Sequence, residues 1–143
     1  MDAAGENLPL LLQKARENSV AFVRPVLAEH GLTEQQWRVL KVLDEHKELS
    51  AQKIATECCI LSPSLSRILA RLHADGLILR KSDHLDQRTL NIRLSAKGKR
   101  IYEKLSPIVM RQYEKLSKSM GQKTLINLLS VLQEFNQFDN HQL

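Results

Sequence analysis

The sequence predicts a mainly α-helical fold with one small β-hairpin, and three observations predict it. The 143 residues are 43% hydrophobic and 26% charged, which is enough apolar material for the core of one domain. Glycine, proline and aromatic residues are sparse, a combination that favours helices over a sandwich or barrel. Apolar residues recur at helical spacing along most of the chain, and only residues 77–95 alternate as strands do.

A first helix is expected over residues 7–30. Asn7 is a suitable N-cap, Pro9 is tolerated in the first turn, and an apolar stripe follows at helical spacing. Pro25 falls near the end, where it bends or finishes the helix, and Gly31 is a stop.

A second helix begins after Thr33, which is the clearest boundary in the chain. Thr33 and Gln36 have the spacing of a capping box, in which each side chain bonds the backbone N–H of the other residue. Leu32 and Trp37 flank them at the positions of a hydrophobic staple.

Two short helices are expected next, and the second has two different faces. Ser50 caps the first, whereas Ser62 caps the second, with Pro63 at its first position and Gly76 at its end. In this second helix the apolar residues fall in one arc of about 100°, and the polar ones fall in another. The apolar arc holds Leu65, Ile68, Leu69 and Leu72, and the polar arc holds Ser64, Arg67 and Arg71.

Two strands, 77–82 and 89–95, are expected on either side of the loop DHLDQR. Basic residues surround this loop, and Asp86 is placed to orient Arg88. Residues 62–100 hold nine lysines or arginines against three acidic residues, a net charge of +6, while the whole chain carries +5. The positive charge is therefore concentrated in the preceding helix and the hairpin.

Two helices complete the chain. Ser95 opens a long helix that Pro107 should kink and Gly121 should end, and a last amphipathic helix follows. With residues 7–30, these helices carry more apolar surface than one small domain can cover, so residues 7–30 and 96–140 are expected to be dimerisation helices. The chain is expected to be a single domain, 1–143, in which residues 33–95 form a DNA-binding lobe.

Two short helices, a glycine that ends the second and a basic hairpin predict, in this order, a winged helix-turn-helix. Arginine binds guanine through two hydrogen bonds, serine bonds bases or phosphates, and a helix N-terminus attracts phosphate. The predicted DNA-binding residues are Ser62, Ser64, Ser66, Arg67, Arg71, Arg80, Lys81, His84, Asp86 and Arg88. Taken without the hairpin, Arg67 and Arg71 would be better explained as part of a solvated helix face.

Several short motifs are shared with a known family. They are SPSLSR (62–67), RL (71–72), DGLI (75–78), DQR (86–88) and LSAKG (94–98). With them the sequence resembles the MarR family of bacterial winged-helix regulators over nearly its full length. The segments LTEQQWRVL and CILSPSLSRILARLHADGLI resemble repressors of homoprotocatechuate (hydroxyphenylacetate) degradation. The turn before the second short helix departs from the family pattern, because it holds Cys58-Cys59 and no glycine.

The resemblance implies a homodimer that binds an inverted-repeat operator in double-stranded DNA. It implies a repressor of an aromatic-acid catabolic operon, located in the bacterial cytoplasm and associated with the nucleoid when bound. It also implies that a small aromatic acid, such as hydroxyphenylacetate, releases the repressor from DNA. No cofactor is expected.

The acid's binding residues are argued from its chemistry. A carboxylate is best bound by two parallel hydrogen bonds from an arginine guanidinium, and an aromatic ring is best bound between apolar side chains. Arg16 lies about 80° from the stripe of the first helix, near enough to face a crevice. Trp37, His30, Arg38 and Cys59 are further candidates. An intersubunit ion pair is an equally good explanation for Arg16.

Other function classes find less support. Cys58 and Cys59 suggest an oxidant sensor as an alternative, but neighbours in sequence pair poorly, and a cysteine at the end of an apolar helix usually packs. The five histidines lack metal-ligand spacing, so no metal site is expected. No phosphate loop or catalytic motif predicts an enzyme, and no apolar run predicts a membrane span. A winged helix used only for protein contact is the other alternative.

Overall fold

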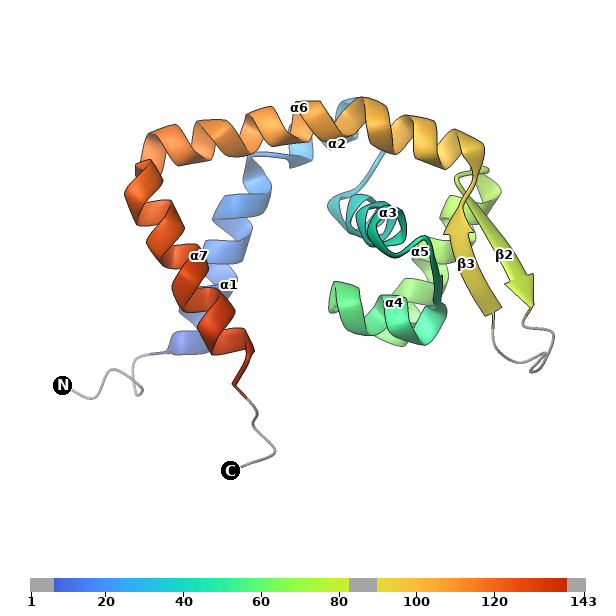
Figure 1. Cartoon of the computed structure of the whole chain (residues 1–143), viewed down its shortest axis with the longest axis horizontal. Helices are drawn as coiled ribbons and strands as arrows, with labels where there is room; N and C mark the ends of the chain where they lie inside the picture. Colours follow the sequence, from blue (N-terminus) through green and yellow to red (C-terminus); the bar gives the residue numbers. More distant parts are fainter. Residues whose placement is uncertain (1–6, 83–89, 139–143) are drawn as a thin grey trace.

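The computed structural model describes residues 7–82 and 90–138, and it is mainly helical with a small antiparallel sheet (Figure 1). The elements in chain order are α1 (Leu8–Ala21), α2 (Arg24–Glu29), α3 (Glu34–His46), β1 (Glu48–Ser50), α4 (Ala51–Cys58), α5 (Ser62–Ala74), β2 (Ile78–Ser82), β3 (Leu90–Leu94), α6 (Ala96–Met120) and α7 (Gln122–Asn136). The predicted fold class is confirmed.

The long helix α6 spans two unequal parts of the molecule (Figure 1). Under one end lie α3, α4, α5 and the sheet, and under the other end lie α1 and α7. The buried core belongs to the first part and continues beneath α2 and α6. Its most deeply buried large side chains are Leu27, Leu40, Leu43, Ile54, Leu72, Ile78, Ile92 and Leu105. No residue of α7 is buried.

The first expected helix is two helices in the structure. α1 ends at Ala21 and α2 begins at Arg24, so the prediction of one helix over residues 7–30 was wrong. Pro25 has no N–H for the carbonyl of Ala21, and its ring would clash with that carbonyl in a continuous helix. In the first turn of α2 the same proline needs no partner. Asn7 precedes α1 as expected, but its side chain makes no capping hydrogen bond.

The capping box at the start of α3 is confirmed. The Gln36 backbone N–H donates to Thr33 Oγ1 at 3.1 Å, and the Thr33 N–H donates to Gln36 Oε1 at 3.0 Å. Leu32 and Trp37, on either side, are both buried. The start of α3 is therefore determined by local sequence.

Ser50 and Ser95 cap α4 and α6 as expected, because each hydroxyl accepts a backbone N–H of the first turn. The prediction for Ser62 was wrong by one residue. Leu61 is the extended N-cap of α5, Ser62 is the first helical residue, and Pro63 follows it.

The predicted hairpin is confirmed, and the structure adds a third strand. β2 pairs with β3 from Ile78 opposite Leu94 to Ser82 opposite Leu90. β1 pairs with the other edge of β3, so the strand order is β1-β3-β2. Its three residues are too few to show alternation in the sequence. The helix α6 continues through Pro107 and ends at Met120, and Gly121 follows as its C-cap with a φ of 93°.

Candidate nucleic-acid interface

The helix α5 separates apolar and basic side chains as its periodicity predicts. Leu65, Leu69 and Leu72 are each less than 5% exposed and face the core. Arg67 and Arg71 are exposed on the outer side of the helix. The outer side of α5 therefore offers two guanidinium groups, one helical turn apart.

The other polar residues of α5 differ in how they are held. Ser64 is half-buried, whereas Ser66 is exposed and its hydroxyl donates to the carbonyl of Ser62 at 3.1 Å. Arg71 donates through Nε to Asp75 Oδ2 at 3.1 Å, an i,i+4 pair that aligns its side chain along the helix. The Nη atoms at the tip of Arg71 take no part in that pair.

Basic residues of β2 lie on both faces of the hairpin that β2 and β3 form. Residues opposite each other in an antiparallel pair share a face, and neighbours in a strand alternate. Arg80, opposite the buried Ile92, therefore lies on the face that continues into the core, while Lys81, opposite Asn91, lies on the other face. His84, Asp86 and Arg88, three of the predicted contact residues, lie outside the described residues.

A compact junction joins the end of α5 to the start of α6. Ser95 donates its hydroxyl to the Gly76 carbonyl at 2.6 Å and its N–H to the Leu77 carbonyl at 3.0 Å. The same hydroxyl accepts the N–H of Gly98 at 3.0 Å. Lys97 Nζ donates to the Asp75 carbonyl at 3.0 Å. These bonds determine the direction in which the hairpin of β2 and β3 leaves α5.

Two of the candidate effector residues converge on a carboxylate. Arg16 Nη2 on α1 donates to Glu34 Oε2 at 3.0 Å, and Arg38 on α3 binds both carboxylate oxygens of Glu34. Arg16 thus makes its ion pair within one protomer. Sequence reasoning missed Glu34, although its i,i+4 spacing to Arg38 was a usable signal.

The side chains of the other three candidate effector residues form no hydrogen bond with Glu34. Trp37 is 7% exposed and stacks on Tyr102 of α6, with ring centroids 4.9 Å apart. Cys59 is exposed at the end of α4. His30 bonds the Val26 carbonyl at 3.0 Å and lines a depression of about 180 Å³ whose lining includes neither arginine. The structure therefore does not bring all five candidates together.

Tyr113 of α6 lies within electrostatic range of Glu34. Tyr113 is 41% exposed, and the partial burial of its phenol, followed by the nearby charge of Glu34, raises its pKa. No local signal could have revealed this proximity, because Tyr113 is 79 residues away from Glu34 along the chain.

The two cysteines have different environments. Cys58 is buried, and burial raises the pKa of its thiol to about 11. A thiol that stays protonated at neutral pH is a poor nucleophile, so the environment of Cys58 does not favour the oxidant-sensing alternative. Cys59, at φ 52°, has the left-handed backbone that glycine adopts most easily.

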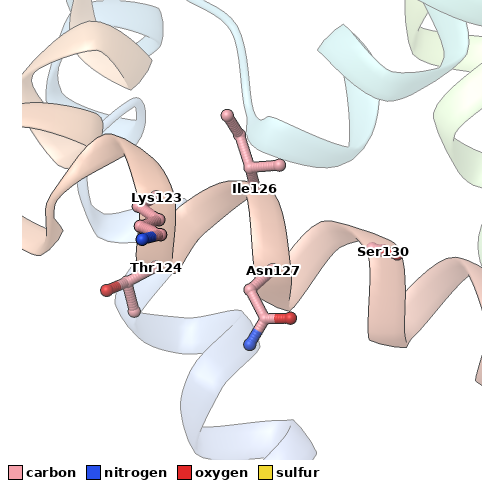
Figure 2. Close-up of a pocket in the computed structure, with 5 residues that line it drawn as sticks. All are labelled: Lys123, Thr124, Ile126, Asn127 and Ser130. Carbon is pink, nitrogen blue, oxygen red and sulfur yellow. The ribbon is translucent and has the colours of Figure 1, made fainter.

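The helices α1, α6 and α7, which meet in the left part of Figure 1, keep large apolar side chains exposed. On α1, α6 and α7 they are Leu8, Leu10, Leu11, Met110, Tyr113, Met120, Ile126, Leu128, Leu129, Val131 and Phe135. A depression of about 500 Å³ on α7 is lined by Lys123, Thr124, Ile126, Asn127 and Ser130 (Figure 2). All five belong to one helix, so this surface is not an enclosed ligand site within a protomer.

Within residues 7–82 and 90–138, no group of three or more histidine, cysteine or acidic side chains is arranged to hold a metal ion. No helix in these ranges is both long enough and apolar enough to cross a bilayer.

Known proteins match this chain both over residues 32–90 and over nearly its full length. The MarR family model matches residues 32–90. The homoprotocatechuate degradative operon repressor of Escherichia coli is 35% identical over 130 residues, which are 91% of this chain and 88% of that repressor.

Solved structures agree over nearly the full length. The transcriptional regulator PA4135 superposes with a TM-score of 0.89 at 37% identity, over 93% of this chain and 98% of that one. NadR in complex with 4-hydroxyphenylacetate superposes with a TM-score of 0.83 at 31% identity, over 92% and 96% of the two chains. These proteins are regulators of transcription rather than enzymes.

Proposed function

The chain belongs to the MarR family of transcriptional regulators, and from this premise we propose a dimeric repressor that an aromatic acid releases from an inverted-repeat operator. The observation that carries the proposal is the outer side of α5. On that side Arg67 and Arg71 are exposed, while the leucines on the opposite side of α5 are buried. The basic hairpin of β2 and β3 follows α5 in the chain.

In this proposal α5 enters the major groove of DNA. Arg67 binds a guanine edge with Ser64 beside it, and the N-terminal end of α5 approaches a phosphate. Arg80 and Lys81, on opposite faces of β2, contact the backbone of the duplex on either side of the wing. The loop residues His84, Asp86 and Arg88 remain proposed contacts in the adjacent minor groove.

A second copy of the chain covers the exposed apolar side chains of α1, α6 and α7. A solvent-exposed helix that buries none of its residues, as α7 does here, leaves an apolar patch typical of an interface. Interlocking these helices sets two lobes side by side. Their α5 helices then enter successive major grooves, roughly 34–36 Å apart.

The effector is proposed to be a phenolic acid of the hydroxyphenylacetate class. Two relatives support this class: one represses homoprotocatechuate degradation, and the other was crystallised with 4-hydroxyphenylacetate. Arg16 supplies the guanidinium for the carboxylate, beside Arg38, which binds the same Glu34. The acid acts only if it binds more tightly to a lobe spacing that does not fit the operator.

The DNA face is tested by anisotropy titration of operator DNA from the protein's own promoter. Arg67→Ala should lose about 1–3 kcal/mol of binding free energy and discriminate less between sequences, as expected for a lost bidentate contact. Arg100→Ala removes the same charge from an exposed position on α6 and serves as the matched control. Equal losses in both variants would show that α5 contributes only general charge.

The effector is tested with the fluorescence of Trp37, the only tryptophan in the chain. Addition of 4-hydroxyphenylacetate or 3,4-dihydroxyphenylacetate should change this fluorescence and release operator DNA. Arg16→Ala should keep operator binding and lose the response. A folded Arg16→Ala dimer with undiminished ligand affinity would show that Arg16 has a different, structural role.

A further inference from the structure

A bridge of charged side chains runs from α1 through α3 to the turn before α5. Arg16 and Arg38 share Oε2 of Glu34, at 3.0 Å and 2.6 Å, and Arg38 Nε also donates to Glu34 Oε1 at 2.9 Å. The third arm of Arg38, Nη1, donates to the carbonyl of Cys58 at 2.6 Å. One carboxylate therefore connects a dimerisation helix with the end of α4.

The Glu34–Arg38 part of the bridge is sheltered from solvent, whereas the side chain of Arg16 is 46% exposed. The side chains of Glu34 and Arg38 are 18% and 24% exposed, and their contact is bidentate. By contrast, Arg16 approaches Glu17 only to 3.5 Å, and both of those side chains are about half exposed. Sheltered, bidentate charge pairs hold their geometry, whereas exposed single contacts contribute little.

Arg38 acts at the point where the chain turns into α5. Cys58 ends α4, and the last carbonyls of a helix have no partner within it and attract positive charge. The Cys58 thiol donates back to the Arg38 carbonyl at 3.7 Å, so α3 and the end of α4 are joined from both sides. Cys59 follows with a left-handed backbone, and α5 begins three residues later.

We propose that Glu34 couples the effector to the recognition helix: a ligand carboxylate displaces Glu34 from Arg16, and the repulsion between the two carboxylates turns Glu34 and thereby loosens the hold of Arg38 on the α4–α5 turn. This proposal rests on the proposed function and specifies its regulation. The ligand needs donors that Glu34 Oε2 now occupies, and its charge repels Glu34. Because both oxygens of Glu34 hold Arg38, rotation of Glu34 draws Arg38 away from the Cys58 carbonyl.

The test compares Glu34→Gln with Glu17→Gln, which removes the other carboxylate beside Arg16 but does not contact Arg38. Amide hydrogen exchange is measured without ligand at Cys59 and Ile60, whose N–H groups bond the last turn of α4. Glu34→Gln should speed exchange about tenfold, as for a weakened charge-assisted hydrogen bond. Glu17→Gln should leave the rate unchanged.

Calorimetry with 4-hydroxyphenylacetate supplies a second readout. Glu34→Gln should bind the acid several-fold more tightly, because a competing carboxylate is gone, whereas simple structural damage would weaken binding. Arg38→Lys keeps the positive charge but cannot bind Glu34 and the Cys58 carbonyl together, so it should speed amide exchange at the turn even without ligand.

Equal exchange in the two glutamine variants, or an unchanged or weaker affinity for the acid in Glu34→Gln, overturns the coupling role. If the wild-type protein binds none of the phenolic acids, the effector assignment is wrong, and so is the proposed competition between the effector and Glu34 for Arg16. The exchange comparison needs no ligand, so it separately confirms or overturns the bridge from Glu34 to the turn.

Discussion

Replacing Gly98 by alanine tests the junction that directs the hairpin of β2 and β3 away from α5. A Cβ atom at Gly98 would lie 2.0 Å from the carbonyl oxygen of Leu77 and 3.0 Å from its carbonyl carbon. An ordinary carbon–oxygen contact is about 3.3 Å, so the two segments must separate by more than an ångström. Leu77 offers a backbone atom rather than a flexible side chain, and that carbonyl also accepts the N–H of Ser95.

Two opposing terms determine the size of the effect. Alanine is favoured over glycine inside a helix by about 1 kcal/mol, which would stabilise α6. Overpacking costs about 1–3 kcal/mol, and the upper part of that range applies where backbone must move. We therefore expect Gly98→Ala to lower the free energy of unfolding by about 1–2 kcal/mol and the Tm by several degrees.

Thermal and urea unfolding at one fixed protein concentration measure this change, since the stability of a dimer depends on concentration. Lys99→Ala is the matched control, because its neighbouring position on α6 is exposed and should shift stability by less than about 0.5 kcal/mol. A Gly98→Ala variant as stable as the wild type, or more stable, would refute the close approach of α6 to Leu77.

Three further outcomes are expected. Removing α7 from Lys123 onward should expose α1 and α6 and give aggregated or unfolded protein; a well-behaved monomer in sedimentation would contradict the interlocked dimer. Thr33→Ala should lower the free energy of unfolding by about 1 kcal/mol in urea denaturation, whereas Gln35→Ala, at an exposed neighbouring position, should change it little. At pH 8 a thiol reagent should label the exposed Cys59 rapidly and Cys58 only on unfolding, because burial raises the pKa of Cys58 to about 11; two equally fast thiols would show that Cys58 is accessible.

Parts of the candidate site could be predicted because they depend on local periodicity. Arg67 and Arg71 had to lie on the face opposite Leu65 and Leu69 once that stretch became a helix, and they do. Their contact with DNA stays a prediction. The alternation of β2 shows that Arg80 and Lys81 face opposite ways, a consequence of register that the sequence reading of one basic cluster had not separated.

The bridge at Glu34 could not be predicted in the same way. Its contacts join residues 18 and 20 positions apart, from α1 to α3 and from α3 to α4. Such contacts depend on how helices pack, and many sequences with the same periodicity would pair other side chains. Tyr113 shows more clearly what the sequence cannot predict, because α6 brings it within electrostatic range of Glu34 although the two are 79 residues apart along the chain.

The sequence by itself determined the elements whose causes are local. Hydrogen bonds within four residues set the starts of α3, α4 and α6, and an apolar arc set the buried face of α5. Only the tertiary structure decided which apolar surface stays uncovered and where β1 pairs. A three-residue strand has no stability until β3 lies beside it, and the apolar stripe of α7 stays exposed because α6 carries it away from the core. Burial and strand pairing belong to the whole folded chain, whereas capping and helical periodicity belong to a few neighbouring residues.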